Sequence, residues 1–338
     1  MLSVMANPLI EIAPGIPAPT ISVQNFDPNL SCEPNEILAK FKVGEWTNFH
    51  MAAYQDWNND AIYALDVSLI NVADPTDGRN PIHIACQYDN YRFLKIILGF
   101  YELDINATDK NGYTALHIAA KHGHERCLNA LVLASSGSGS KQVDLNLGGF
   151  DCPTALHLAI ANEEIGCVRT LIQAGANINA TYGNKARTCL HLAAKKGNEP
   201  IVRLLTTYRP YSSDPNNQNQ PLACRPALVD AEGKTAMHYA ASGNHSGCVD
   251  LLIRAGARVN RRTDEGKTAL HIAAEKGYKK TTKLLLKHKI DKDSVDKWGM
   301  KAIEYAMMYG HNEVIGILMD FSSIDLLKNY TKGKATKK

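Results

Sequence analysis

A short motif recurs along the chain at an almost constant interval, and this constrains the fold more than any other feature. From motif start to motif start the intervals are 33, 34, 40, 34, 47, 33 and 33 residues. The copies are TNFHMAA from Thr47, NPIHIAC from Asn80, TALHIAA from Thr114, TALHLAI from Thr154, TCLHLAA from Thr188, TAMHYAA from Thr235, TALHIAA from Thr268 and, more weakly, KAIEYAM from Lys301. A fixed period of this length indicates a linear array of similar units, each covering the apolar face of the next.

The composition is that of a soluble globular protein, with 45% hydrophobic and 21% charged residues among 338. The eight cysteines form no C-x-x-C pair, and three of them occupy the same slot of the repeat, so we expect buried, reduced thiols. The first basic residue is Lys40, and no apolar run approaches the length of a membrane span. We therefore expect an intracellular protein, cytoplasmic or nuclear, with no membrane partner.

A 33-residue period that contains T-x-L-H-x-A-A resembles the ankyrin-repeat family, over roughly residues 36–322. The resemblance implies an all-α solenoid of about eight helix-turn-helix repeats joined by β-turn or hairpin loops. The repeats are expected to start near residues 42, 75, 109, 149, 183, 230, 263 and 296.

One unit shows how the residues specify this structure. Gly112 suits a turn that needs positive φ, and Thr114 can cap a first helix that stops near Gly123. A second helix is predicted over about 125–134, with Cys127 among the apolar residues at helical spacing on one face. Such a pair cannot bury that face alone, so neighbouring units must stack on it.

The motif histidine recurs too often for an active site, which needs one base in one place. In the ankyrin-repeat family this histidine links the start of its own helix to the backbone of the neighbouring repeat, and the resemblance implies this structural role for His50, His83, His117, His157, His191, His238 and His271. A buried ring at a packed seam must be hydrogen-bonded in some such way.

Composition predicts irregular segments at both ends and at two insertions. The predictions are an acidic, proline-rich disordered arm over 1–35, a covering helix over 35–42, inserted loops over 135–142 and 208–226, and a C-terminal cap with a basic tail over 323–338.

The sequence lacks the motifs of common enzymes and metal sites. The chain has no glycine-rich phosphate loop, no G-x-S-x-G and no H-E-x-x-H. His117, His122 and His124 could suggest a metal cluster, but His122 should point away from His117. We predict no catalytic residue, cofactor or metal.

A protein-binding surface is the stronger hypothesis, formed by the turn tips and the ends of the first helices. The candidate contact residues are Trp46, Tyr54, Arg79, Tyr88, Tyr113, Lys121, His122, Arg187, Lys195, Lys196, Lys234, Lys267, Lys276, Trp298 and Tyr309. Aromatic residues gather at both ends and basic ones between them, which favours an extended or acidic protein segment over nucleic acid. The alternative is that the lysines only keep the array soluble. We expect a monomer.

The family also suggests a modification. The asparagine that closes an L-x-x-G-A-x-x-N stretch is a frequent target of asparaginyl hydroxylation in ankyrin repeats, and Asn179 and Asn260 match it. The alternative is that each asparagine only stabilises its own turn.

Three functions remain open at this point. The first is a non-enzymatic adaptor or scaffold. The second is an inhibitor or regulator of Rel-type transcription factors, since the long array with irregular insertions partly resembles the IκB group, although no DSGxxS motif occurs in residues 1–40 and the chain ends basic. The third is a targeting subunit of a ubiquitin ligase or phosphatase.

Overall fold

The computed structural model describes residues 46–55, 57, 59–134, 142–149, 151–208 and 223–319. The predicted acidic arm, the covering helix over 35–42 and the C-terminal cap with its basic tail lie outside the described residues, as do most of the two inserted loops.

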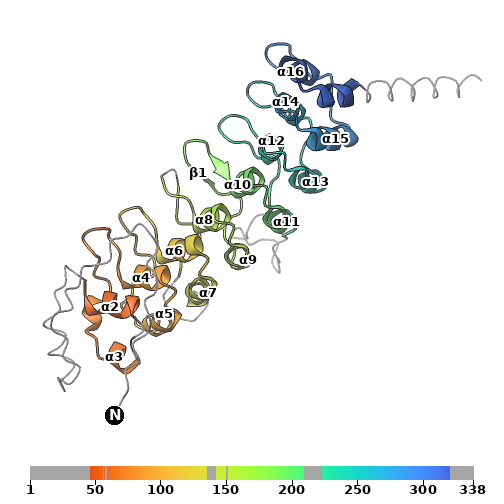
Figure 1. The fold of residues 1–338 in the computed structure, drawn as a ribbon. Helices are drawn as coiled ribbons and strands as arrows, with labels where there is room; N and C mark the ends of the chain where they lie inside the picture. The colour runs from red at the N-terminus through yellow and green to blue at the C-terminus, as the bar shows by residue number, and fades with distance from the viewer. Residues whose placement is uncertain are drawn as a thin grey trace, which may run out of the picture.

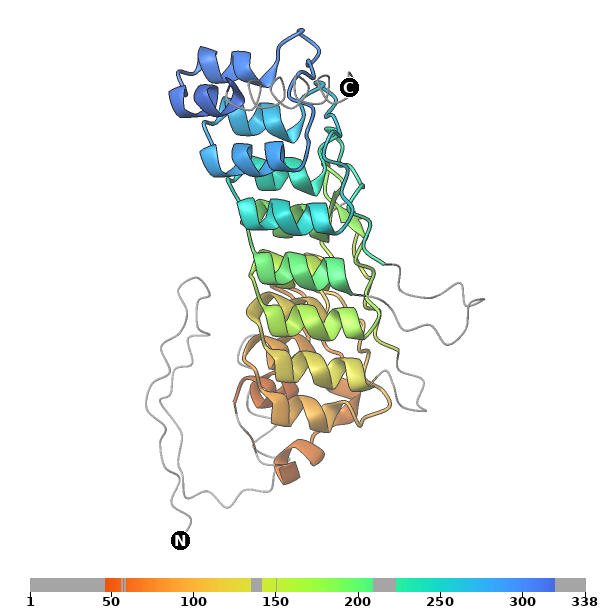
Figure 2. The same ribbon diagram turned by 90° about the vertical axis from the view of Figure 1, so that its right-hand side faces the viewer.

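The described chain forms two parallel rows of helices (Figures 1 and 2). The inner row holds the helix that follows each motif start: α2 (Asn48–Tyr54), α4 (Pro81–Gln87), α6 (Ala115–His122), α8 (Ala155–Ala161), α10 (Cys189–Lys196), α12 (Ala236–Ser242), α14 (Ala269–Glu275) and α16 (Ala302–Met308). The outer row holds α3 (Asn59–Tyr63), α5 (Tyr91–Ile97), α7 (Glu125–Ala134), α9 (Ile165–Gln173), α11 (Glu199–Thr207), α13 (Ser246–Arg254), α15 (Lys279–Lys287) and a helix over 312–319. A 3-10 turn, η1, spans Val67–Leu69. The predicted all-α solenoid is confirmed.

The core runs along the whole array and has no single centre. The sixth residue of the motif shows why, because it is alanine in all eight copies and is fully buried in each: Ala52, Ala85, Ala119, Ala159, Ala193, Ala240, Ala273 and Ala306. A methyl group at this position lets successive inner helices approach closely, and the larger apolar side chains of each repeat fill the space between the two rows.

Local sequence signals define the helix ends. Thr114 is the N-cap of α6, and Gly123 ends that helix at φ 73°. Gly197 ends α10 in the same left-handed conformation, which glycine adopts without steric cost. The predicted second helix of this unit is confirmed as α7, Glu125–Ala134.

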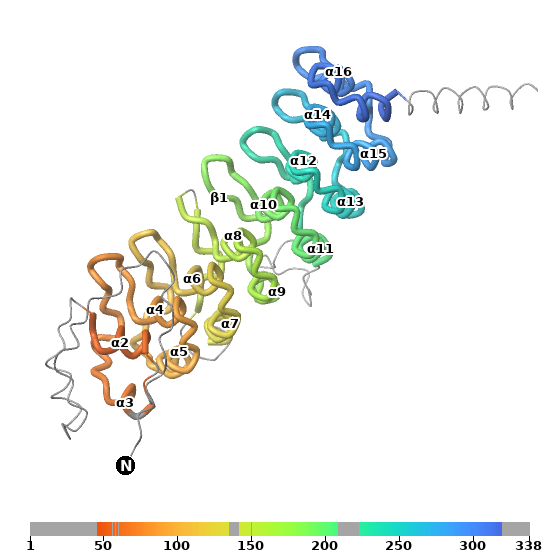
Figure 3. Tube along the Cα trace, in the orientation of Figure 1, coloured from red at the N-terminus to blue at the C-terminus, as the bar shows by residue number. Residues whose placement is uncertain are grey.

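A hairpin precedes each inner helix from α4 to α16 and projects beyond it (Figure 3). An aspartate organises several of these turns: Asp109 Oδ1 accepts from the backbone N–H groups of Asn111, at 2.8 Å, and Tyr113, at 2.9 Å. Asp230 and Asp296, each five residues before a motif start, repeat this pattern. Within the described residues the only paired strands are β1 (Thr181–Tyr182) and β2 (Arg187–Thr188).

Neighbouring hairpins are joined by single backbone hydrogen bonds. These are Lys110 N to Asp77 O, Ala231 N to Lys185 O, Asp264 N to Glu232 O and Lys297 N to Glu265 O, at 2.9 to 3.1 Å. Among the described residues, no such bond joins the hairpins before α6 and α8, where Cys152 Sγ donates to Gly112 O at 3.4 Å instead. None joins the hairpin before α8 to the β1–β2 hairpin before α10 either, and we call this second junction the α8/α10 seam. Its second hairpin has Gly183 in place of the turn aspartate, as the hairpin before α8 has Gly149, and its Ala186 takes a positive φ of 47°.

Candidate functional site

Two sets of residues require a functional explanation: the repeated histidines and the surface made by the hairpin tips and the ends of the inner helices. We call that surface the inner strip. It holds all the predicted contact residues that the structure describes, and it follows one side of the array from α2 to α16 (Figure 1).

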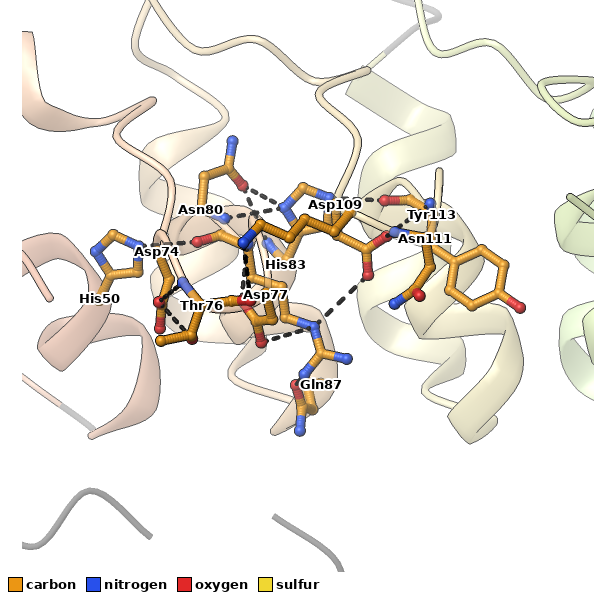
Figure 4. A network of polar contacts seen from close by, with 12 residues as sticks. His50, Asp74, Thr76, Asp77, Asn80, His83, Gln87, Asp109, Asn111 and Tyr113 are labelled. Carbon is orange, nitrogen blue, oxygen red and sulfur yellow. Dashed lines mark hydrogen bonds and ion pairs between the residues drawn. The ribbon is translucent and has the colours of Figure 1, made fainter. Parts of the chain in front are cut away.

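Each motif histidine bonds to the first residue of its own motif, and most also bond to the next repeat (Figure 4). His83 Nδ1 accepts from the backbone N–H of Asn80 at 3.2 Å, and its Nε2 donates to the carbonyl of Tyr113 at 3.0 Å. A carbonyl can only accept, so the proton is on Nε2. The corresponding Nε2 acceptors are Arg79 O for His50, Leu147 O for His117, Lys234 O for His191, Arg261 O for His238 and Met300 O for His271, at 3.0 to 3.1 Å.

Burial keeps these rings neutral. It lowers the pKa of every motif histidine, and for His157 and His238 it lowers the pKa to about 4. A ring that is buried, neutral and bonded through both nitrogens has no free atom for catalysis. The geometry supports the structural role for six of the seven histidines.

His157 departs from the expected pattern. Its Nδ1 lies 2.8 Å from Thr154 Oγ1, as in the other copies. Its Nε2, however, is buried and has no hydrogen-bond partner among the described residues. The ring packs instead against the edge of Tyr182 in β1, with 4.7 Å between ring centroids. His157 therefore makes no hydrogen bond within 3.5 Å across the α8/α10 seam, although the carbonyls of Arg187 and Ala180 lie near enough to raise its pKa slightly against the effect of burial. The backbone bond between hairpins is also missing here among the described residues.

Aromatic side chains cluster at the N-terminal end of the inner strip. Tyr54 lies edge-on to Trp46 at 6.1 Å and to Tyr88 at 4.7 Å between centroids. Tyr88 is exposed, while Trp46 is half-buried and donates its indole N–H to Asp74. The structure thus brings three predicted contact residues together.

Arg79, by contrast, is held within its own and the next repeat. Its Nη1 donates to Gln87 Oε1 at 2.6 Å, and its Nε lies 3.4 Å from Asp77 Oδ2 and 3.7 Å from Asp109 Oδ2 (Figure 4). The carboxylate of Asp109 is fully buried, so Arg79 balances a charge inside the array.

Two further cations of the inner strip belong to a repeated arrangement that was not predicted from the sequence. Arg187 Nε donates to the hydroxyl of Tyr239 at 2.9 Å, and that hydroxyl donates to Asp230 Oδ2 at 2.6 Å. The guanidinium carbon also lies 5.1 Å from the centre of the Tyr239 ring. The sequence did contain a signal for this contact. A tyrosine follows the fourth motif residue and lies nine residues after the turn aspartate.

The same arrangement joins α14 to α16. The hydroxyl of Tyr305 donates to Asp296 Oδ2 at 2.6 Å, and Lys267 Nζ lies over the Tyr305 ring. Lys267 also bonds to Glu275 at 2.9 Å; burial alone would lower its pKa, but this hydrogen bond raises it. Lys267 is therefore already paired.

The predicted basic middle of the strip is largely neutralised in the same way. Lys234 and Lys185 both bond to Glu232, and these hydrogen bonds lower the pKa of Glu232 to about 2. Lys196 lies 3.8 Å from Glu163 Oε1. Lys195 and Lys276 are exposed and make no ion pair with a described residue.

Two other predicted contact residues meet aromatic rings. Lys121 Nζ lies 5.9 Å from the centre of the Tyr113 ring, and His122 stacks on His124. His124 itself binds the carbonyl of Cys86, at 2.7 Å from its Nδ1. His122 is exposed whereas His117 is buried, and the described residues contain no group of three or more side chains arranged to hold a metal ion.

The C-terminal end of the strip exposes large apolar side chains. Trp298 at the hairpin tip is 64% exposed, and Met308 and Tyr309 at the end of α16 are 64% and 54% exposed. Their counterparts one repeat earlier are Glu265, Glu275 and Lys276. The last described repeat thus replaces charged residues with apolar ones at three positions of the strip, and exposed groups of this kind are typical of contact sites.

The two asparagines proposed for hydroxylation face the next repeat. Asn179 donates its amide N–H to Ala223 O and accepts from Arg225 N, each at 3.0 Å, and Asn260 accepts from Asp291 N at 2.8 Å. Each therefore stabilises the junction of two repeats, and hydroxylation of either asparagine stays a prediction. Asn71, Asn106 and Asn146 form similar bridges.

None of the helices in the described parts of the chain is long and apolar enough to span a membrane.

Comparison with known proteins gives a consistent family assignment. A family model described as ankyrin repeats (3 copies) matches residues 49–144, 133–219, 156–263, 211–296 and 261–330. Together these matches span most of the chain.

Individual relatives are similar over parts of their length. The nuclear factor NF-kappa-B p105 subunit of Rattus norvegicus is 32% identical over 154 residues, which are 45% of this chain and 14% of that protein. The B-cell lymphoma 3 protein homolog of Mus musculus is 28% identical over 231 residues, 57% of this chain and 47% of that protein. The NF-kappa-B inhibitor zeta of Bos taurus is 27% identical over 242 residues, 61% of this chain and 30% of that protein. The chain thus matches less than half the length of each of these relatives.

Proposed function

Because the chain belongs to the ankyrin-repeat family, we propose that it is a non-enzymatic adaptor that holds a segment of a partner protein along the inner strip. The observation that carries the proposal is the exposure of Trp298, Met308 and Tyr309 on one repeat. Large apolar side chains on a rigid array lose little conformational entropy when they are covered, so they make effective contact sites.

Most basic side chains of the inner strip already have partners within the protein, and this limits which segments of a partner protein the strip can bind. Lys267, Lys234 and Arg187 already have acidic or aromatic neighbours, so recruiting them would break existing contacts. Lys195 and Lys276 remain to attract carboxylates. We therefore propose an extended segment that places apolar side chains on the last described repeat and carries one or two acids towards these lysines.

Regulation of Rel-type transcription factors is the second candidate. It is supported by the names of the relatives, which include an NF-kappa-B subunit and an NF-kappa-B inhibitor. A regulator of this kind would act in the cytoplasm, the nucleus or both. The absence of a DSGxxS motif from residues 1–40 argues against control through that degradation signal.

Site-specific photo-crosslinking tests the proposal. A photoreactive phenylalanine in place of Tyr309 should crosslink to a partner protein in cells, whereas the same residue in place of Leu133, which is also exposed but lies on outer helix α7, should not. Mass spectrometry of the crosslinked product identifies the partner, and a Rel-type protein would favour the second candidate. Equal crosslinking from both positions would contradict the inner strip as the binding surface.

A further inference from the structure

A shallow groove lies on the outer row of helices, away from the inner strip. It runs between α13 and α15, which are neighbours in the outer row (Figure 1). Its lining residues are Ser246, Gly247, Asp250, Lys280, Lys283, Leu284 and Lys287. Nothing in the proposed function uses this surface.

The groove is basic because of the spacing of the lysines in α15. The helix buries Thr281, Thr282, Leu285 and Leu286, and this fixes which side faces the solvent. Lys280, Lys283 and Lys287 are all exposed and are three and four residues apart, so they form one stripe of about 10 Å along the helix. Their charges act together along a line.

These three lysines have no acidic partner in the described residues. None makes a hydrogen bond or an ion pair within 4 Å with a described residue. Lys283 only contributes, through its charge at longer range, to lowering the pKa of Glu313. The neighbouring Lys279, on the edge of the stripe, does bind Glu313, at 2.8 Å. Asp250, the one acid in the groove, is already engaged by Arg254 at 2.8 Å. The stripe therefore keeps its positive charge.

The stripe is specific to this repeat. At the same three helix positions α13 has Gly247, Asp250 and Arg254, and α11 has Pro200, Arg203 and Thr207. Three lysines with no partner cost electrostatic repulsion within one helix, and the repeat architecture does not need them there. An external anion would relieve that repulsion.

We propose that this groove binds an acidic segment of a partner protein, with carboxylates along the lysine stripe and an apolar side chain against Leu284 and the backbone at Gly247. The half-buried Leu284 and the small Ser246 leave room for a side chain between the two helices. The groove has no aromatic residue on which a base could stack and includes the carboxylate of Asp250, which disfavours nucleic acid. The site goes beyond the proposed function, because it would give the adaptor a second, separate binding face.

The test uses the full-length chain and a fluorescein-labelled peptide of glutamates and leucines, followed by fluorescence anisotropy. The variant Lys280→Glu/Lys283→Glu/Lys287→Glu should weaken peptide binding by at least about tenfold. The variant Lys95→Glu/Arg126→Glu/Arg169→Glu makes the same change in net charge on exposed residues of outer helices α5, α7 and α9, outside both the groove and the inner strip, and it should leave binding within about twofold of the unmodified protein.

Two further measurements separate a groove from a general charge effect. Ser246→Trp fills the groove without changing its charge, so it should also weaken the peptide by at least about tenfold. Far-ultraviolet circular dichroism and the melting temperature establish that each variant is folded. Equal losses in the groove and control triple variants, or no loss in Ser246→Trp, would overturn the proposal. Tighter binding of a labelled oligothymidylate through the same lysines would overturn the assignment to a protein segment.

Discussion

The ammonium group of Lys267 lies 4.5 Å from the centre of the Tyr305 ring, although the two residues belong to different repeats. The hydroxyl of the same tyrosine donates to Asp296, which organises the hairpin of its own repeat. A cation, a ring and a turn aspartate thus connect α14 to α16, and Arg187, Tyr239 and Asp230 repeat the arrangement between α10 and α12. These contacts stabilise the array through residues that its motif does not specify.

We predict that Tyr305→Phe destabilises the protein by about 1–3 kcal/mol, because the buried carboxylate of Asp296 loses a hydrogen-bond donor. Urea unfolding followed by circular dichroism measures the difference. Tyr309→Phe is the matched control, since its side chain is more than half exposed, and its free energy of unfolding should change by less than about 0.5 kcal/mol. Equal effects of the two substitutions would exclude a stabilising role for the Tyr305–Asp296 contact.

The contribution of the histidine hydrogen bonds to stability can be tested with phenylalanine, which keeps an aromatic ring but has no ring nitrogen. His117→Phe leaves the Leu147 carbonyl without its donor and should cost about 1–3 kcal/mol. His157→Phe should cost less by about 1 kcal/mol, because Nε2 of His157 has no partner to lose. Denaturant titration of both variants makes the comparison. A larger loss for His157→Phe would show that the α8/α10 seam is bonded like the others.

Stability should fall as the solution is acidified from about pH 6.5 towards pH 4. Burial lowers the folded-state pKa of His157 and His238 to about 4, below the value of about 6.5 expected for an unfolded chain. Between these values the unfolded chain binds more protons, so acid favours unfolding. A tenfold difference in proton affinity between the folded and unfolded chains corresponds to about 1.4 kcal/mol for each histidine. Unfolding midpoints at several pH values measure the slope. A flat profile over this range would contradict the lowered pKa values.

Two glycines with the same backbone conformation should differ in their tolerance of a methyl group. Gly183 and Gly197 have φ of 73° and 76°, so an alanine at either should cost about 1 kcal/mol in backbone strain. A Cβ atom at Gly197 would also lie 2.3 Å from Nδ1 of His245, whereas at Gly183 it would meet nothing within 4 Å. Gly197→Ala should therefore lower the melting temperature clearly more than Gly183→Ala. Similar melting temperatures would show that His245 moves aside freely.

The repeat motif predicts the backbone well because its residues act locally. Thr114 caps its own helix, Gly123 ends it, and Ala119 lies between helices in a place that any repeat of this length provides. The contacts of surface side chains could not be predicted in this way. Lys267 meets Glu275 eight residues later and Tyr305 in the next repeat, and a lysine at a hairpin tip gives no sign of which neighbour is acidic. The cations of the inner strip could therefore be located from the sequence, but fewer of them are available to a partner than the sequence indicated.

The exception at His157 had no clear sequence signal. Gly183 stands at the turn-aspartate position of the next hairpin, but Gly149 does the same in the hairpin that follows His117, and His117 still donates to Leu147 O. The loss of one histidine bond therefore could not be predicted from the turn residue of the neighbouring repeat.

The α8/α10 seam also divides the inner strip between its two aromatic ends. Tyr88 lies on one side of it, and Trp298 and Tyr309 lie on the other. A partner long enough to reach both ends would place this junction under tension. It should yield first, because it is the junction at which the motif histidine makes no hydrogen bond within 3.5 Å to the next repeat and the described hairpins share no backbone bond. The array would then bend at this one junction when a partner binds, while the repeats on either side stay rigid. The distance between its two aromatic ends would adjust to the length of the bound segment.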